Sequence, residues 1–155
     1  SLTQSGGTAT YARTYSLIHN TISGGSTFCG TTPERPDNDT PGSVTSSAVG
    51  SDFSVSGSTI DYTGASGALL RISGTVSFSV SDDVDIYLSI FKEGTEVAAT
   101  STRTSCTAGA YYTIPLPETT VTGNTNDTFE VRIATATGTT TTTMHRHGLN
   151  IERVY

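Results

Sequence analysis

The most regular feature of the chain is an alternation of apolar and polar residues between positions 70 and 80. Every even position holds an apolar residue or glycine, and arginine, serine or threonine stands between them. A period of two over this length indicates a β-strand with one buried and one solvated face. After a turn at Asp82 and Asp83 the alternation continues through residues 84–90, which predicts a second strand beside the first.

This second strand carries apolar side chains on both of its faces. Tyr87 and Phe91 stand at odd positions, opposite the apolar residues at even positions that are expected to face the core. One face is therefore expected to meet the core and the other a neighbouring subunit, because aromatic residues are enriched at protein interfaces. The alternative is that these rings cap the ends of the core.

The rest of the chain after residue 51 also consists of short apolar segments separated by turn residues. Turn signals at Gly57, Gly94 and Gly138 separate short apolar segments that recur every 10 to 15 residues or so, and no helical period is visible. This pattern favours an all-β domain of antiparallel strands, a sandwich or barrel, over residues 52–155. Further strands are predicted at 53–55, 59–62, 96–102, 111–116, 129–133, 139–146 and 149–151.

Residues 1–51 have a different character. One strand is possible from Tyr11 to Ile18, whereas the proline-rich stretch 33–41 excludes a helix and any central strand. We therefore predict an irregular N-terminal arm that becomes ordered against a partner. Its candidate contact residues are Tyr11, Arg13, Tyr15 and Arg35.

Charge and composition exclude several classes of protein. The chain is rich in serine and threonine, but only 14% of its residues are charged, so a folded β protein is favoured over disorder. A net charge of −6 with a single lysine, Lys92, argues against nucleic-acid binding, since phosphates would be repelled. No apolar segment approaches the roughly 20 residues of a membrane-spanning helix, and no membrane association is predicted.

Two groups of residues are candidate metal sites. His145 and His147 stand two positions apart, so in a regular strand they share one face and both could ligate zinc. No third ligand is evident nearby, and exposed or interface imidazoles are the favoured interpretation. Asp82, Asp83 and Asp85 lack the spacing of a dedicated calcium loop, so they are read as a solvated turn. We predict no metal, no cofactor and no enzymatic activity.

Cys29 and Cys106 leave two alternatives open. A disulfide between them would close a long loop and stabilise the fold by about 4 kcal/mol. The favoured alternative is two independent, small, buried residues, because nothing in the spacing demands a bridge.

The stretch from about Ile60 to Val154 resembles the jelly-roll domain of the C1q and tumour-necrosis-factor (TNF) superfamily, in the form found in tailed-phage virion proteins. The resemblance rests on residues 70–80, the hairpin 87–95 with Lys92-Glu93-Gly94 at its turn, and the late segments 126–133 and 149–153. It implies an antiparallel jelly-roll sandwich and a compact homotrimer. The first 50 residues lie outside it.

The resemblance also implies a function. Phage relatives decorate capsids or form the binding heads of fibres. The leading prediction is a bacteriophage structural protein that sits as a trimer on the outer capsid surface and cements the shell of the major capsid protein. The alternative is a receptor- or carbohydrate-binding head of a fibre or adhesin. The candidate residues of the trimer interface are Tyr87, Phe91, Tyr112 and Tyr155.

Overall fold

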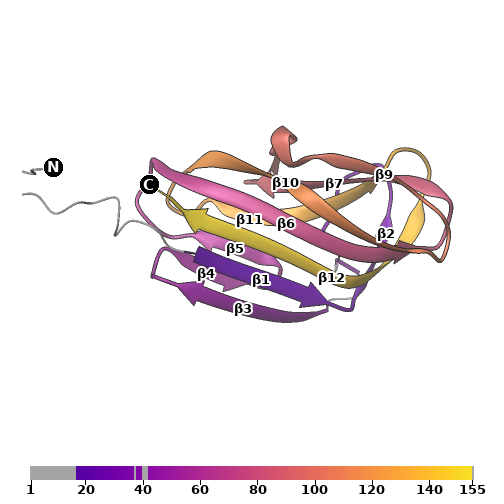
Figure 1. The fold of residues 1–155 in the computed structure, drawn as a ribbon, viewed down its shortest axis with the longest axis horizontal. Helices are drawn as coiled ribbons and strands as arrows, with labels where there is room; N and C mark the ends of the chain where they lie inside the picture. The colour runs from indigo at the N-terminus through magenta and orange to yellow at the C-terminus, as the bar shows by residue number, and fades with distance from the viewer. Residues whose placement is uncertain (1–16, 37, 40–41, 155) are drawn as a thin grey trace, which may run out of the picture.

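Two antiparallel β-sheets pack face to face in the computed structural model, which describes residues 17–36, 38–39 and 42–154 (Figure 1). In the first sheet the strand order is β10-β6-β12-β1-β3, and β2 pairs with β12. In the second the order is β4-β5-β11-β7-β8, and β9 pairs with β7. We call them sheet A and sheet B. Many neighbouring strands are distant in sequence, as a jelly-roll sandwich requires.

The strand bounds are as follows. Sheet A contains β1 (Leu17–Ser23), β2 (Ser26–Cys29), β3 (Ser43–Val49), β6 (Ala68–Val80), β10 (Tyr111–Gly123) and β12 (Thr140–Arg153). Sheet B contains β4 (Phe53–Ser56), β5 (Thr59–Tyr62), β7 (Val84–Lys92), β8 (Thr95–Glu96), β9 (Thr102–Cys106) and β11 (Thr128–Thr135). A short 3-10 helix, Ala98–Thr100, follows β8. No helix among the described residues is long and apolar enough to cross a membrane.

The alternation at residues 70–80 forms the strand predicted from it. In β6 the even-numbered residues are buried and the odd-numbered residues point away from the core. Gly74 takes an inward position because space is missing there: a Cβ atom would lie 2.9 Å from the carbonyl oxygen of Gly148 and 3.2 Å from Cδ1 of Leu116. The glycine therefore lets β6 approach its neighbours closely.

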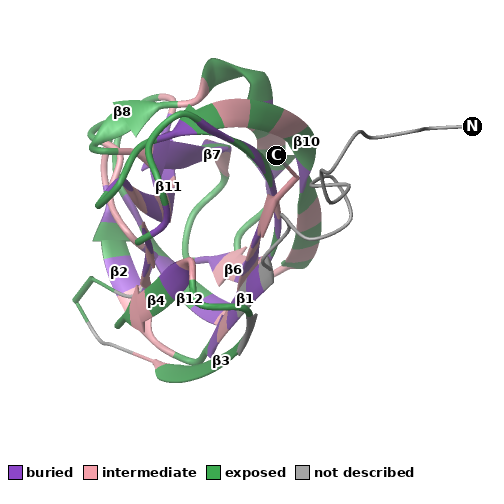
Figure 2. Cartoon of the chain, turned by 90° about the vertical axis from the view of Figure 1, so that its left-hand side faces the viewer, coloured by how far each residue is buried: buried purple, intermediate pink, exposed green. Residues whose placement is uncertain are grey.

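The core lies between the two sheets, and an end-on view shows buried segments on both of them (Figure 2). Leu70, Ile72, Val76 and Phe78 from sheet A meet residues of sheet B such as Phe129. The largest fully buried side chains are those of Tyr62, Phe78, Phe129, Ile18, Ile22, Ile60, Leu70, Ile72, Ile86, Leu88, Ile90 and Ile133.

The structure differs from the predicted irregular arm over residues 17–49. β1 lies inside sheet A, between β12 and β3, and Ile18 and Ile22 are buried in the core. The alternation was hidden because the inward position between these isoleucines holds a polar residue, Asn20, which is also buried. Of the arm candidates, Tyr11, Arg13 and Tyr15 lie outside the described residues.

Candidate functional site

A β-bulge in β12 decides which side chains reach the outward face of sheet A. The pairing of β12 with β6 shifts register between Met144 and Arg146. A bulge puts one extra residue on one strand and re-aims the side chains that follow it. His145 is consequently partly exposed, Arg146 is exposed, and His147 is 98% buried, with a relative exposure of 2%.

The bulge corrects the prediction for His145 and His147. In a regular strand residues two apart share a face, but here the extra residue turns His147 into the core while His145 stays outside. No group of three or more histidine, cysteine or acidic residues in the described part of the chain could hold a metal ion. The two imidazoles therefore do not form a pair of ligands.

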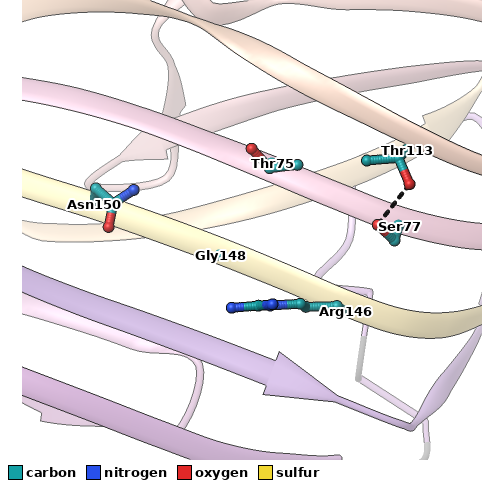
Figure 3. A pocket seen from close by; sticks show the side chains of 6 residues that line it. All are labelled: Thr75, Ser77, Thr113, Arg146, Gly148 and Asn150. Atoms are coloured by element: carbon teal, nitrogen blue, oxygen red, sulfur yellow. Dashed lines mark hydrogen bonds between the residues drawn. The ribbon is translucent and has the colours of Figure 1, made fainter.

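Next to the bulge, the outward face of sheet A contains a trough of about 320 Å³. It crosses β10, β6 and β12, and its lining residues are Thr75, Ser77, Thr113, Arg146, Gly148 and Asn150. Figure 3 shows Arg146 extended beside β12 at the level of Gly148, with Asn150 farther along the same strand. On the other side the hydroxyls of Ser77 and Thr113 are 2.9 Å apart. The trough thus combines a guanidinium, an amide and hydroxyls, and none of its lining residues carries a carboxylate.

An aromatic pair borders the trough. The ring of Tyr111, at the start of β10, is 4.5 Å from the imidazole of His145 between centroids, and its residue is 77% exposed. Nε2 of His145 lies 3.2 Å from Oγ of Ser79, which fixes the imidazole on β6. Tyr111 and Thr113 are two residues apart on one strand and therefore share a face. The pair and the trough form one surface, which we call the sheet A site.

The acidic residues on the outward face of sheet A lie away from the trough. On sheet A the acidic residues Glu118 and Glu152 lie beside Arg71, at 3.9 Å and 3.5 Å, and not in the trough. Sheet B instead carries Asp85 paired with Arg103, and Glu130 2.7 Å from Nε of Arg132. Arg146 is therefore the one charged residue among those that line the trough.

The three predicted interface aromatics that the structure describes do not form one patch. Tyr87 lies on sheet B, 37% exposed, with the guanidinium of Arg103 5.4 Å from its ring centroid. Phe91 is on the same strand but only 7% exposed, beneath Arg132. Tyr112 packs toward the core, 5.9 Å from Phe78 between ring centroids, and its hydroxyl accepts a hydrogen bond from the backbone N–H of Thr107. Tyr155 lies outside the described residues.

Arg35, the remaining arm candidate, lies against sheet B. Its guanidinium donates to the hydroxyl of Ser58 over 3.1 Å and lies 3.8 Å from the carboxylate of Glu130. The preceding residue, Glu34, forms a two-way backbone bridge with Ile133 in β11. This part of the proline-rich segment is thus attached to the sandwich.

The aspartates at the start of β7 are bound within the chain. Asp85 accepts hydrogen bonds from Ser105 and Arg103, and these bonds lower the pKa of its carboxyl. Asp83 accepts the backbone N–H of Ala108 over 2.8 Å. Their oxygens therefore connect the turn between β6 and β7, and the start of β7, to β9 and to the loop that follows it.

The two cysteines are both free and buried. Burial is the main cause that raises the pKa of Cys29 to about 12, and the charge of Glu34 adds to it. Burial likewise raises the pKa of Cys106 to about 11. Of the two alternatives, the structure contains independent buried thiols, and both stay protonated at neutral pH.

Sequence reasoning missed the sheet A site. Arg146 and Tyr111 lie in predicted strands, but the face of each depends on the bulge and on the pairing of β10 with β6. The available signal was the polar alternation of Ser73, Thr75 and Ser77 on the outward face of β6, which marks a stretch of surface that carries hydroxyls.

Comparison with known proteins gives likenesses in structure only. No protein-family model matches the sequence, and no curated protein matches it significantly. Murine APRIL superposes with a TM-score of 0.56 at 12% identity, covering 90% of this chain and 98% of that one. The Eiger TNF of S. frugiperda gives 0.55 at 10% identity, covering 91% and 93%.

A viral protein has a similar structure. The PRD1 vertex protein P5 superposes with a TM-score of 0.50 at 14% identity, covering 90% of this chain and 96% of that chain. At such identities the likeness concerns the fold. The two antiparallel sheets of the described residues and these superpositions confirm the predicted fold: the chain is a jelly-roll sandwich similar to those of TNF-family ligands and of P5.

Proposed function

We propose that the protein is a structural protein of a bacteriophage particle, and that it sits as a homotrimer on the outer capsid surface and cements the shell of the major capsid protein. The observation that carries the proposal is the sheet A site, a surface with an exposed tyrosine, an arginine and hydroxyls but no carboxylate in its trough. Interface centres are depleted in acidic residues and lysine and enriched in tyrosine and arginine. The sheet A site has this composition.

The fold supports the proposal in a second way. The C1q/TNF resemblance implies a trimer, and the PRD1 vertex protein P5 is by its name a component of a virus particle. In the proposed trimer the outward face of sheet A contacts the next subunit, and the outward face of sheet B stays in solvent. This places the subunit contact on Tyr111, His145 and Arg146, and not on Tyr87 and Phe91.

Light scattering coupled to size exclusion tests the trimer. The expected mass is three times the 16.1 kDa of the chain. A monomer at micromolar concentration would contradict the proposal, because a particle-surface trimer has to persist at such concentrations to bind by several contacts at once.

Cosedimentation with capsids that lack the protein tests the cementing role. Many weak contacts to neighbouring shell subunits would hold the trimer by avidity, so binding should be saturable and should raise the temperature at which the shell opens. A deletion of residues 1–14 tests whether Tyr11 and Arg13 contact the shell and leaves every described strand in place. Bound trimer without any change in shell opening would contradict cementing.

A receptor- or carbohydrate-binding head remains the second candidate, and one observation favours it. The ring of Tyr111 is 77% exposed beside a trough of hydroxyls, an amide and a guanidinium, groups that can stack on and hydrogen-bond a sugar. A glycan array separates the two functions, since a cementing protein should bind no glycan. Binding that is lost in Tyr111→Ala would favour the head.

A further inference from the structure

Arg146 differs from the other basic residues of the described chain. Each of the others lies within ion-pair distance of a carboxylate: Arg35, Arg71, Lys92, Arg103, Arg132 and Arg153. Arg146 has no such acidic partner in residues 17–36, 38–39 and 42–154. In a chain with 14 acidic and 8 basic residues, an arginine is expected to find an acid easily. Its isolation follows from its place at a trough whose lining contains no acidic residue.

The surroundings of Arg146 are arranged to receive a ligand. A solvated arginine alone would mean little, but this one borders a trough of about 320 Å³. The absence of a side chain at Gly148 keeps the middle of the trough open, and Asn150, Thr75 and Ser77 add polar groups around it. A guanidinium donates two parallel hydrogen bonds to a carboxylate, and nearby hydroxyls and amides can donate to the remaining lone pairs. The chemistry of the trough fits a carboxylate.

We propose that the trough is completed by a second copy of the chain, whose carboxylate side chain enters it and pairs with Arg146. The inference rests on the proposed trimer and names the contact that holds it together. The trough, at about 320 Å³, is large enough for a side chain. The chain itself supplies exposed carboxylates without an ion pair among the described residues, for example those of Asp82 and Glu96. In a cyclic trimer each subunit gives one such group to the next and receives one, so the same contact closes the ring.

The test compares Arg146→Met with a matched control, Arg71→Met. Both substitutions remove a guanidinium from the same face of sheet A, but Arg71 has Glu118 and Glu152 beside it within its own chain. Sedimentation of a dilution series measures the trimer dissociation constant. We expect Arg146→Met to raise the concentration at which trimers dissociate by at least about 30-fold. We expect Arg71→Met to change it by less than about fivefold.

Two further measurements test whether weaker trimers of Arg146→Met result from loss of the ion pair and not from a general effect of the substitution. Arg146→Lys keeps the charge and the long side chain but loses the paired hydrogen bonds, so its effect should fall between wild type and Arg146→Met. Raising the salt concentration from 0.05 M to 1 M should weaken the wild-type trimer more than the Arg146→Met trimer, because an ion pair is screened. Circular dichroism shows whether each variant is folded. If Arg146→Met does not fold, Arg146→Lys and the salt series on wild type decide.

The outcomes separate this inference from the proposed function. A wild-type monomer overturns the trimer and the carboxylate contact together. A wild-type trimer that Arg146→Met weakens no more than Arg71→Met does overturns only the carboxylate contact, and the trimer stands. Support for both would be a trimer dissociation constant that rises more in Arg146→Met than in Arg71→Met, together with a weaker salt dependence of the Arg146→Met trimer than of the wild-type trimer.

Discussion

At the scale of single residues, the ion pairs of this chain differ in how far their side chains are buried. Nζ of Lys92 lies 2.9 Å from Asp127 and donates to the carbonyl of Thr122 over 2.7 Å, and the side chains of the pair are only 24% and 12% exposed. The same Asp127 oxygen accepts the N–H of Asn124, so the pair joins the hairpin after β7 to the turn before β11. The single lysine of the chain thus has a structural role.

Lys92→Met should lower the free energy of unfolding by about 2 kcal/mol, because it leaves the carboxylate of Asp127 largely buried without its cation. Urea denaturation measures the change. The control is Arg71→Met, which breaks more exposed pairs on sheet A and should cost less than about 1 kcal/mol. Equal losses of unfolding free energy in the two variants would show that the buried Lys92–Asp127 pair stabilises the fold no more than the exposed pairs of Arg71 do.

The buried thiols predict a loss of stability in alkali. The pKa of Cys29 is raised from 9.0 to about 12 in the folded chain, so the unfolded chain loses this proton first as the pH rises. The stabilising contribution is complete below pH 9 and is lost progressively as the pH approaches 12. Cys29→Ala removes the ionisable group and should flatten the fall of unfolding free energy between these limits, measured by urea titrations at several pH values. An unchanged slope would contradict the prediction.

At the scale of strands, the sequence predicted the elements whose periodicity is uninterrupted. The segments at 70–80 and 84–90 became β6 and β7 because nearly every inward position is apolar. β1 was obscured by Asn20 at an inward position, and its partner strand β12 is more than a hundred residues away. The sheet A site depends on the bulge at His145. No local sequence pattern predicts this bulge, in which one extra residue changes the face of every residue that follows it in the strand.

Gly74→Ala tests the close approach of β6 to its neighbours. The added methyl group would meet the carbonyl oxygen of Gly148 at 2.9 Å, a backbone atom that cannot move without shifting β12. We expect a loss of about 2 kcal/mol in unfolding free energy. Gly30→Ala is the matched control, because a Cβ atom there has no neighbour within 4 Å, and it should be nearly neutral. The prediction fails if both variants unfold at the same urea concentration.

At the scale of the whole molecule, the described N-terminal strands belong to the sandwich that carries the sheet A site. β1 pairs with β12 along residues 17–22 and with β3 along residues 17–23, so it links β3 to the rest of sheet A. Without β1, β12 would lose a neighbour on the side of Gly148 and Asn150, and the trough would lie near a sheet edge. The site therefore requires strands that lie outside the stretch with the C1q/TNF resemblance.

Two truncations test this dependence. Deleting residues 1–50 removes β1, β2 and β3, including Ile18 and Ile22 of the core, and should abolish cooperative unfolding or yield insoluble protein. Deleting residues 1–14 keeps every described strand and should lower the melting temperature by less than about 4 °C, the shift produced by about 1 kcal/mol. Thermal unfolding followed by circular dichroism measures both. If the longer truncation still unfolds cooperatively near the wild-type temperature, residues 52–155 form an independent domain, as predicted from the sequence. In that case, removing residues 1–50 would test the contribution of the arm to capsid binding directly.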